Sequence, residues 1–220
     1  NKLQFLMRAG QELCQDPALA LHFGEAVDVA DISIGCLIGG FSETMAAGFR
    51  LMNRYARLSV DVDHIGGGDR FVLTRRAGQL WMVDTRKDPN DLPELTESTF
   101  ARIVCTSRRS PGRSSPVKAV CVTHPEPAYR PEYDRIFRVP VVFGSNRNAL
   151  LIADDWMTRP LPSASRPVLG ILCAHAEMLL GRLEDSKSAR GRVENLLMRS
   201  LATGETSIDN VAARMGLSRQ

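Results

Sequence analysis

Apolar positions recur at helical spacing through the first thirty residues. In the stretch ALALHFGEAVDVA, Leu19, Phe23, Ala26 and Val27 are predicted to share the apolar face of a helix. The next run, DISIGCLIGG over residues 31–40, is apolar and ends in two glycines. It fits a short strand or a buried connector, and periodicity does not separate the two.

A second helix is predicted from the run ETMAAGFRLMNRYARL. Ser42 stands just before it as the expected N-cap, and Met45, Phe49, Met52 and Tyr55 recur at helical spacing. The pattern then changes to a period of two. LSVDVDHI over residues 58–65 alternates apolar and polar side chains, which is typical of a half-buried strand.

Two further strands, DRFVLTRRA and GQLWMVDTR, are predicted to meet at Ala77–Gly78. The second half continues with mixed elements. We expect a helix beginning at Thr96 with Phe100, Ile103 and Val104 facing inward, a buried strand VKAVCVTH, a short helix Glu132–Phe137, and a hairpin of strands 141–143 and 149–153.

A proline- and serine-rich segment, RPLPSASRP over residues 159–167, is the predicted linker. It leads into one long helix whose apolar stripe consists of Leu169, Leu172, Ala176, Leu179 and Leu183. Small residues beside the stripe permit close helix approach, so this helix is the expected dimerisation element. The alternative is that the stripe packs on the chain's own sheet.

The last residues carry the pattern of a helix-turn-helix. Ser207 precedes an amphipathic run, IDNVAARM, and Gly216 then supplies a tight turn. Ser218, Arg219 and Gln220 would begin a recognition helix, where they would contact DNA. The alternative is that two short helices are simply joined by a glycine turn.

Composition narrows the class of protein. Of the 220 residues, 44% are apolar and 24% are charged, an ordinary globular mixture. The net charge of +3 lies entirely in residues 187–220, where any attraction for a polyanion is expected. No apolar run reaches the length of a membrane span, and no signal-peptide layout opens the chain.

Cysteine and histidine usage predicts a protein without metal or other cofactor. The five cysteines form no CxxC pair and lie mostly in apolar stretches, which indicates reduced thiols in the cytoplasm. The four histidines are scattered and lack metal-ligand spacing. An enzyme is also disfavoured. Cys121 and His124 would point to opposite faces of one strand, and neither a GxSxG nor a Walker-type loop occurs.

The tail SIDNVAARMGLSRQ resembles the first helix-turn-helix of AraC/XylS-type transcription regulators, whose pattern runs I-x-x-V-A-x-x-x-G-x-S. Upstream, HFGEAVDVADIS, LWMVDTR and FRVPVVFGSNRNALLI are similar to the arabinose-binding-like sensor domain of the branch that includes ornithine-utilisation and virulence regulators. The resemblance covers nearly the whole chain, and FRVPVVFGSNRNALLI is its most specific sensor segment.

The resemblance implies a bacterial one-component regulator that binds a small effector, forms a homodimer and binds double-stranded operator DNA. It divides the chain into a sensing domain (1–165), a linker and dimerisation helix (166–186), and the first part of a DNA-binding domain (187–220). Most of the first recognition helix and the second helix-turn-helix are missing. We therefore expect a truncated chain that does not bind its operator specifically. A ligand-binding or interaction module without DNA is the alternative.

Candidate effector contacts are chosen by chemistry, because a pocket needs an apolar lining and a few fixed polar groups. They are Tyr55, Arg76, Trp81 and His124. Each also has an ordinary structural explanation, such as core packing for Trp81 or a bond to a backbone carbonyl for His124.

The predicted fold is α+β, with an antiparallel or mixed sheet flanked by helices and followed by linker helices and the start of a helix-turn-helix. Its alternative is a cupin-like β-barrel sensor, as in the founding member of the wider family. In the mechanism implied by the resemblance, the effector favours one arrangement of the sensor and thereby changes the geometry of the dimer.

Overall fold

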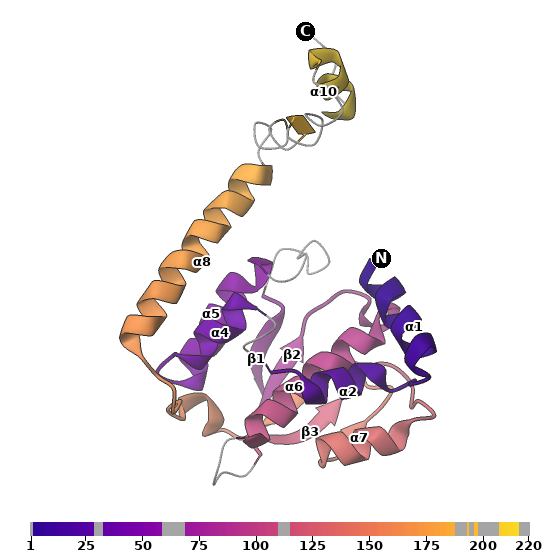
Figure 1. Cartoon of the computed structure of the whole chain (residues 1–220). Coiled ribbons are helices and arrows are strands. Elements are labelled where there is room, and N and C mark those ends of the chain that lie inside the picture. The colour runs from indigo at the N-terminus through magenta and orange to yellow at the C-terminus, as the bar shows by residue number, and fades with distance from the viewer. Residues whose placement is uncertain are drawn as a thin grey trace. The chain divides into compact units, whose positions relative to one another are not determined.

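The computed structural model describes residues 2–28, 33–58, 69–109, 115–187, 193, 196–197 and 207–215. The chain divides into two compact units, Asn1–Gly170 and Ile171–Gln220, each of which is described by itself. The first unit contains a five-stranded sheet with helices, and the described residues of the second belong largely to helix (Figure 1). The predicted strand at 58–65 lies mainly outside the described residues, and so does the run ARGRVENLLMRSLATG (189–204), which contains the second of the predicted linker helices.

The sheet has the strand order β1-β2-β5-β3-β4. Its strands are β1 (Phe71–Arg76), β2 (Gln79–Asp84), β3 (Val117–Cys121), β4 (Val141–Val142) and β5 (Ala149–Ile152). All neighbours are antiparallel except β3 and β4, which run parallel. The described strands form an open sheet with β1 and β4 at its edges, so the barrel alternative is wrong and the mixed α+β prediction is confirmed.

The β1–β2 hairpin forms where the sequence predicts it. Its two-residue turn, Ala77 and Gly78, has φ values of 49° and 76°. Positive φ at both positions matches the twist of two antiparallel strands, and glycine adopts it without a steric cost. The register then pairs Thr74 with Trp81 and Arg76 with Gln79.

The predicted hairpin of 141–143 and 149–153 is wrong, because β4 pairs with β3 and β5 lies between β2 and β3. The residues after β4 continue along the extension of β3. Val122 N donates to the Val142 carbonyl at 2.9 Å, and Gly144 N donates to the His124 carbonyl at 3.0 Å. Their backbone groups are therefore satisfied by β3, and α7 (Arg130–Phe137) makes the crossover that a parallel pair requires.

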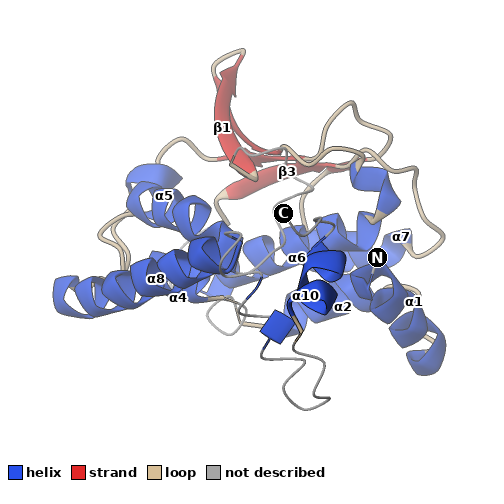
Figure 2. Ribbon diagram, turned by 90° about the horizontal axis from the view of Figure 1, so that it is seen from above, coloured by secondary structure: helices blue, strands red, loops and turns tan. Residues whose placement is uncertain are grey.

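One face of the sheet is covered by α2 (Leu19–Ala26), α6 (Pro93–Arg109) and α7 (Figure 2). The core between these layers contains Leu21, Phe100, Val104, Val120, Tyr133, Ile136, Phe137 and Leu150. The helix α1 (Lys2–Cys14) precedes α2. The predicted inner face of α2 is wrong: Phe23 is 47% exposed, and the buried residues are Ala20, Leu21 and Gly24. Small residues face α6 because the two helices approach closely there.

Residues 34–40 form a helix, α4 (Ile34–Gly40), rather than a strand or connector. Ser33 caps it by accepting a hydrogen bond from Cys36 N at 3.1 Å. Gly39 faces Gly48 of α5 (Met45–Tyr55), and a Cβ on Gly48 would lie 2.6 Å from the Gly39 carbonyl oxygen. The glycines that suggested a connector are therefore the contact surface of a helix pair.

The cap of α5 is Thr44, which accepts a hydrogen bond from Ala47 N, whereas Ser42 donates to the Ile38 carbonyl. The predicted cap at Ser42 is therefore wrong, although the helix itself is confirmed. Short 3-10 turns follow at Ala56–Leu58, Pro89–Asp91 and Trp156–Thr158. The helix α6 begins at Pro93, one turn before the predicted Thr96, and Thr96 is fully buried inside it.

The proline-rich segment 159–167 is hydrogen-bonded to the connection between α4 and α5. Leu161 N donates to the Glu43 carbonyl, and Ser165 N donates to the Phe41 carbonyl. The long helix α8 (Arg166–Lys187) begins within this segment and confirms the predicted helix. In the second unit, α10 (Ile208–Met215) occupies the first helix of the predicted helix-turn-helix.

Candidate functional site

Buried polar side chains gather around the first turns of α6. Four consecutive residues, Thr96 to Thr99, are each at most 4% exposed. Four successive positions surround a helix on all sides, so this part of α6 is enclosed by protein. Buried polar groups need partners, and two networks provide most of them.

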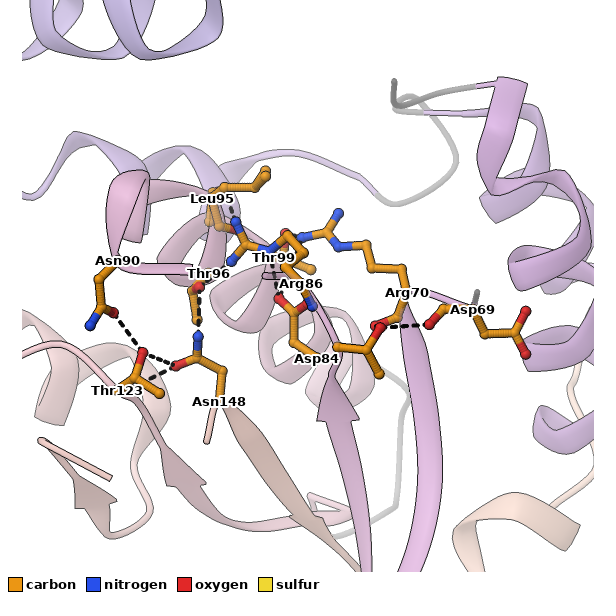
Figure 3. Close-up of polar contacts among 12 residues, drawn as sticks. Asp69, Arg70, Asp84, Arg86, Asn90, Leu95, Thr96, Thr99, Thr123 and Asn148 are labelled. Carbon is orange, nitrogen blue, oxygen red and sulfur yellow. Dashed lines mark hydrogen bonds and ion pairs between the residues drawn. The ribbon is translucent and has the colours of Figure 1, made fainter. Parts of the chain in front are cut away.

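The first network joins the end of β2 to the start of β1 and to α6 (Figure 3). The fully buried carboxylate of Asp84 accepts hydrogen bonds from Arg86 Nε at 2.9 Å and from Arg86 N at 3.1 Å. Arg86 also donates to the Thr96 hydroxyl. Arg70 Nη2 donates to the Thr99 hydroxyl at 3.2 Å and lies 3.8 Å from the Asp84 carboxylate.

Asn148, at the start of β5, extends this network toward β3. Its amide donates to the Thr96 hydroxyl at 3.4 Å, and its side-chain oxygen accepts from Thr123 N at 2.8 Å. The Thr123 hydroxyl lies 2.6 Å from the side-chain oxygen of Asn90. These contacts connect three strand ends, the loop after β2 and α6, as Figure 3 shows.

The first network contains more positive than negative charge. Burial, opposed in part by Asp84, lowers the pKa of Arg70 to about 10, and the charges of Arg86 and Arg102 lower it further. Burial also lowers the pKa of Arg102 on α6. The thiol of Cys36 on α4 lies close enough to influence the pKa of both Arg70 and Arg102. The hydrogen bond from Arg70 to Thr99 joins the start of β1 to α6.

The second network surrounds Glu97, which is 1% exposed. Its Oε1 accepts hydrogen bonds from the hydroxyls of Tyr133 at 2.6 Å and Tyr129 at 2.8 Å. Its Oε2 is buried and has no hydrogen-bond partner among the described residues. Burial raises the pKa of Glu97, while the two tyrosine hydrogen bonds and the charge of His124 act in the opposite direction.

Tyr133 links Glu97 to His124, whose Nε2 lies 3.0 Å from the tyrosine oxygen. His124 Nδ1 lies 2.9 Å from the Pro125 carbonyl, which can only accept, so Nδ1 carries a proton. The Tyr133 hydroxyl donates to Glu97 and also contacts His124, so the three side chains form one buried network.

The four predicted effector contacts are not brought together. Arg76 and Trp81 lie on the sheet face opposite the core, and Trp81 carries the guanidinium of Arg147 at 4.8 Å from its ring. His124 is on the helix side, where its ring contacts Tyr133 and Phe143. Tyr55 is 2% exposed in the α4–α5 pair.

Sequence reasoning missed Arg70, Arg102 and Glu97. In the sequence Arg70 resembles Arg75 and Arg76, and all three flank or belong to the same strand. Glu97 and Arg102 lie on a helix with many charged residues. Arg70, Glu97 and Arg102 differ from the exposed charged residues by their burial, and no local sequence pattern indicates burial.

The remaining predicted contacts concern the second unit and its linker. The stripe residues Leu169, Leu172, Ala176, Leu179 and Leu183 all lie on α8. Ser207 precedes α10, and its hydroxyl accepts a hydrogen bond from Asn210 N at 3.3 Å, as an N-cap does. Ser218, Arg219 and Gln220 lie outside the described residues, so their predicted DNA contacts stay a prediction.

The described residues contain no group of three or more His, Cys, Asp or Glu side chains that could hold a metal ion. Cys121 and His124 form no hydrogen bond with each other there, and burial raises the pKa of the Cys121 thiol. A raised pKa is the opposite of what a cysteine nucleophile requires. No helix in the described ranges is long and apolar enough to cross a membrane.

Residues 1–161 match the family described as the arabinose-binding domain of AraC transcription regulators, N-terminal. The match covers well over half of the chain, and the chain belongs to this family. It therefore has a regulatory sensor role in an AraC-type transcription regulator.

One solved structure supports the same fold. The crystal structure of the transcriptional regulator CdpR from Pseudomonas aeruginosa superimposes with a TM-score of 0.54 at 16% sequence identity, covering 90% of this chain and 71% of that one. At this identity the likeness establishes the fold alone. No curated protein matches the chain.

Proposed function

We propose that residues 1–165 are the effector-sensing domain of a one-component transcription regulator that works in the bacterial cytoplasm. The observation that carries this proposal is the family match over residues 1–161. The buried networks on α6 support it, because they connect helices and strand ends that a ligand could shift together. Five free cysteines are consistent with a reducing compartment.

A thermal-shift screen of the 220-residue chain tests the sensing role. Amino acids, polyamines, fatty acids, aromatic acids and neutral sugars form the panel. A ligand that binds only the folded state raises the melting temperature, by about 5 to 10 °C at about 100 times its Kd. The proposal is contradicted if no compound of any class in the panel raises the melting temperature.

We further propose that residues 187–220 begin a DNA-binding domain that is complete only in a longer protein. The capped helix α10 and the basic excess of this segment support the proposal. Double-stranded operator DNA is the expected partner of that longer protein. A gel-shift assay with the gene's own upstream region, using the longer protein and this chain side by side, should detect a specific complex only with the longer protein.

We also propose that the chain forms a homodimer through the apolar stripe of α8, which lies within the linker and dimerisation helix, residues 166–186. Replacing Leu172 and Leu179 with glutamate should give a folded monomer, because two charges would be buried in an apolar interface. The matched control is Ile171→Glu, since Ile171 is 72% exposed and lies outside the stripe. Sedimentation velocity reports the outcome, and a double variant that keeps the wild-type oligomeric state would exclude this helix from the interface.

A further inference from the structure

Two arginines lie around one carboxylate beside the first turns of α6, and a third arginine, Arg102, belongs to α6 itself. Asp84 is already engaged by Arg86, which contacts both of its oxygens through the side chain and the backbone. Arg70 lies farther from the same carboxylate, at 3.8 Å. Two guanidinium groups therefore face one carboxylate, so positive charge is in excess.

Arg70 is enclosed but only partly satisfied. Its side chain is 9% exposed, and its Nη2 donates to Thr99. Its Nε is buried and has no hydrogen-bond partner among the described residues. A buried donor of a charged group is costly to leave unpaired, whereas a second oxyanion would satisfy it.

Arg102 completes the arrangement from α6. It follows Thr99 by three residues, so both lie on the same face of the helix, and Thr99 already contacts Arg70. In the described part of the chain, the Arg102 guanidinium makes neither a hydrogen bond nor an ion pair. Against the larger effect of burial, Cys36, on α4, raises the pKa of both arginines.

We propose that Arg70 and Arg102 bind the oxyanion group, a carboxylate or a phosphate, of the small-molecule effector. The proposal rests on the sensing function proposed above and names the chemical class of its ligand. Planar guanidinium groups donate two parallel hydrogen bonds to such oxyanions, which gives both affinity and orientation. A neutral sugar carries no charge, so it would not compensate the excess positive charge at this site.

The site also offers a physical route from binding to the rest of the domain. Arg70 precedes β1, Arg102 belongs to α6, and Cys36 belongs to α4, which packs on α5. An anion held between the arginines would favour the arrangement that keeps these three elements together. The α4–α5 connection is hydrogen-bonded to the segment that leads into α8.

Thermal shift of the full 220-residue chain tests the proposal with benzoate, L-glutamate, inorganic phosphate and L-arabinose in a buffer free of phosphate and carboxylate. We expect at least one anion to raise the melting temperature by about 5 to 10 °C at about 100 times its Kd. Arg102→Met should weaken that anion's binding by about tenfold or more. Arg102→Lys should bind the anion with an affinity between those of the wild type and of Arg102→Met.

Arg75→Met is the matched control, because Arg75 lies on β1 with its side chain 60% exposed and pairs with Asp154. It should keep the wild-type response to the anion. Without ligand, Arg102→Met should melt at the wild-type temperature or higher, because it removes a half-buried positive charge that has no ion-pair partner among the described residues. If only benzoate or L-glutamate raises the melting temperature, the ligand group is a carboxylate. If only inorganic phosphate raises it, the ligand group is a phosphate.

The proposal is overturned if no anion stabilises the chain, or if Arg102→Met responds to the anion as the wild type does. If L-arabinose stabilises both forms equally and the anions do not, the oxyanion site is wrong while the sensing function stands. If neither the anions nor any neutral or cationic compound of the wider panel stabilises the chain, the sensing function fails as well.

Discussion

Replacing Tyr133 with phenylalanine removes one hydroxyl from the centre of the Glu97 network. Tyr133 is fully buried, and its oxygen lies 2.6 Å from Glu97 Oε1 and 3.0 Å from His124 Nε2. The ring remains, so its contacts with Phe137 and Phe143 are kept. The substitution therefore tests the polar contacts almost alone.

The expected loss of stability follows from the buried polar groups that the substitution leaves without a hydrogen-bond partner. Glu97 retains only the hydrogen bond from Tyr129, and His124 Nε2 loses the one partner that the described residues provide. Each of the two buried groups that lose this partner costs about 1 to 3 kcal/mol, so we expect a loss of about 2 to 6 kcal/mol. For a domain of this size, that lowers the melting temperature by about 5 to 20 °C.

Urea unfolding followed by circular dichroism measures this loss, with Tyr129→Phe as the matched control. Tyr129 donates to the same Glu97 oxygen at 2.8 Å, but it is only half-buried, so water can replace its hydroxyl. We expect the control to cost about 1 kcal/mol. If Tyr133→Phe costs no more than the control, the buried network does not stabilise the fold as argued.

Three further substitutions test other parts of the structure. Because burial raises the pKa of Glu97, the contribution of Glu97 to stability decreases as the pH rises above 4.5, the ordinary pKa of a glutamate. Glu97→Gln should abolish that decrease, which urea unfolding at successive pH values measures. Hydrogen bonds to Asp16 at 2.6 Å and Glu132 at 2.9 Å raise the pKa of His22. His22 should therefore stabilise the fold fully below its ordinary pKa of 6.5, and this stabilisation should be lost as the pH rises through the raised pKa. The reasoning is contradicted if the stability of a His22→Gln variant depends on pH above 6.5 as strongly as that of the wild type. Gly24→Ala would place a Cβ 2.2 Å from the Ser98 carbonyl oxygen and should cost about 3 kcal/mol or more, whereas Gly170→Ala, with open space around its Cβ, should be neutral or slightly stabilising in the same denaturation assay.

The local pattern of the chain predicted most elements correctly, because a helix or hairpin depends on residues near each other in sequence. The β1–β2 hairpin follows from its turn residues, and α5, α6, α7 and α8 follow from apolar spacing, although the predicted cap of α5 and the predicted start of α6 are wrong. The failures at residues 31–40 and at Ser42 both depend on tertiary contacts. Gly39 contacts Gly48 between α4 and α5, and Ser42 donates to the Ile38 carbonyl of α4 instead of capping α5.

The candidate site was not predictable in the same way. Only His124, among the four residues chosen by chemistry, belongs to one of the buried networks, and it does so through Tyr133. Arg70, Glu97 and Arg102 have close equivalents elsewhere in the chain that are exposed. Their distinguishing property is burial, which is decided by the helices and strands that cover them.

By itself the sequence determined the class of protein and the type of nearly every described element, since family patterns, helical spacing and caps are properties of neighbouring residues. Only the tertiary structure decided that β5 lies between β2 and β3 and that Arg70 and Arg86 meet beside Asp84. Strand order and charge balance depend on contacts between residues far apart in the chain. Such contacts leave no periodic trace in the sequence, because they arise only once the layers have packed.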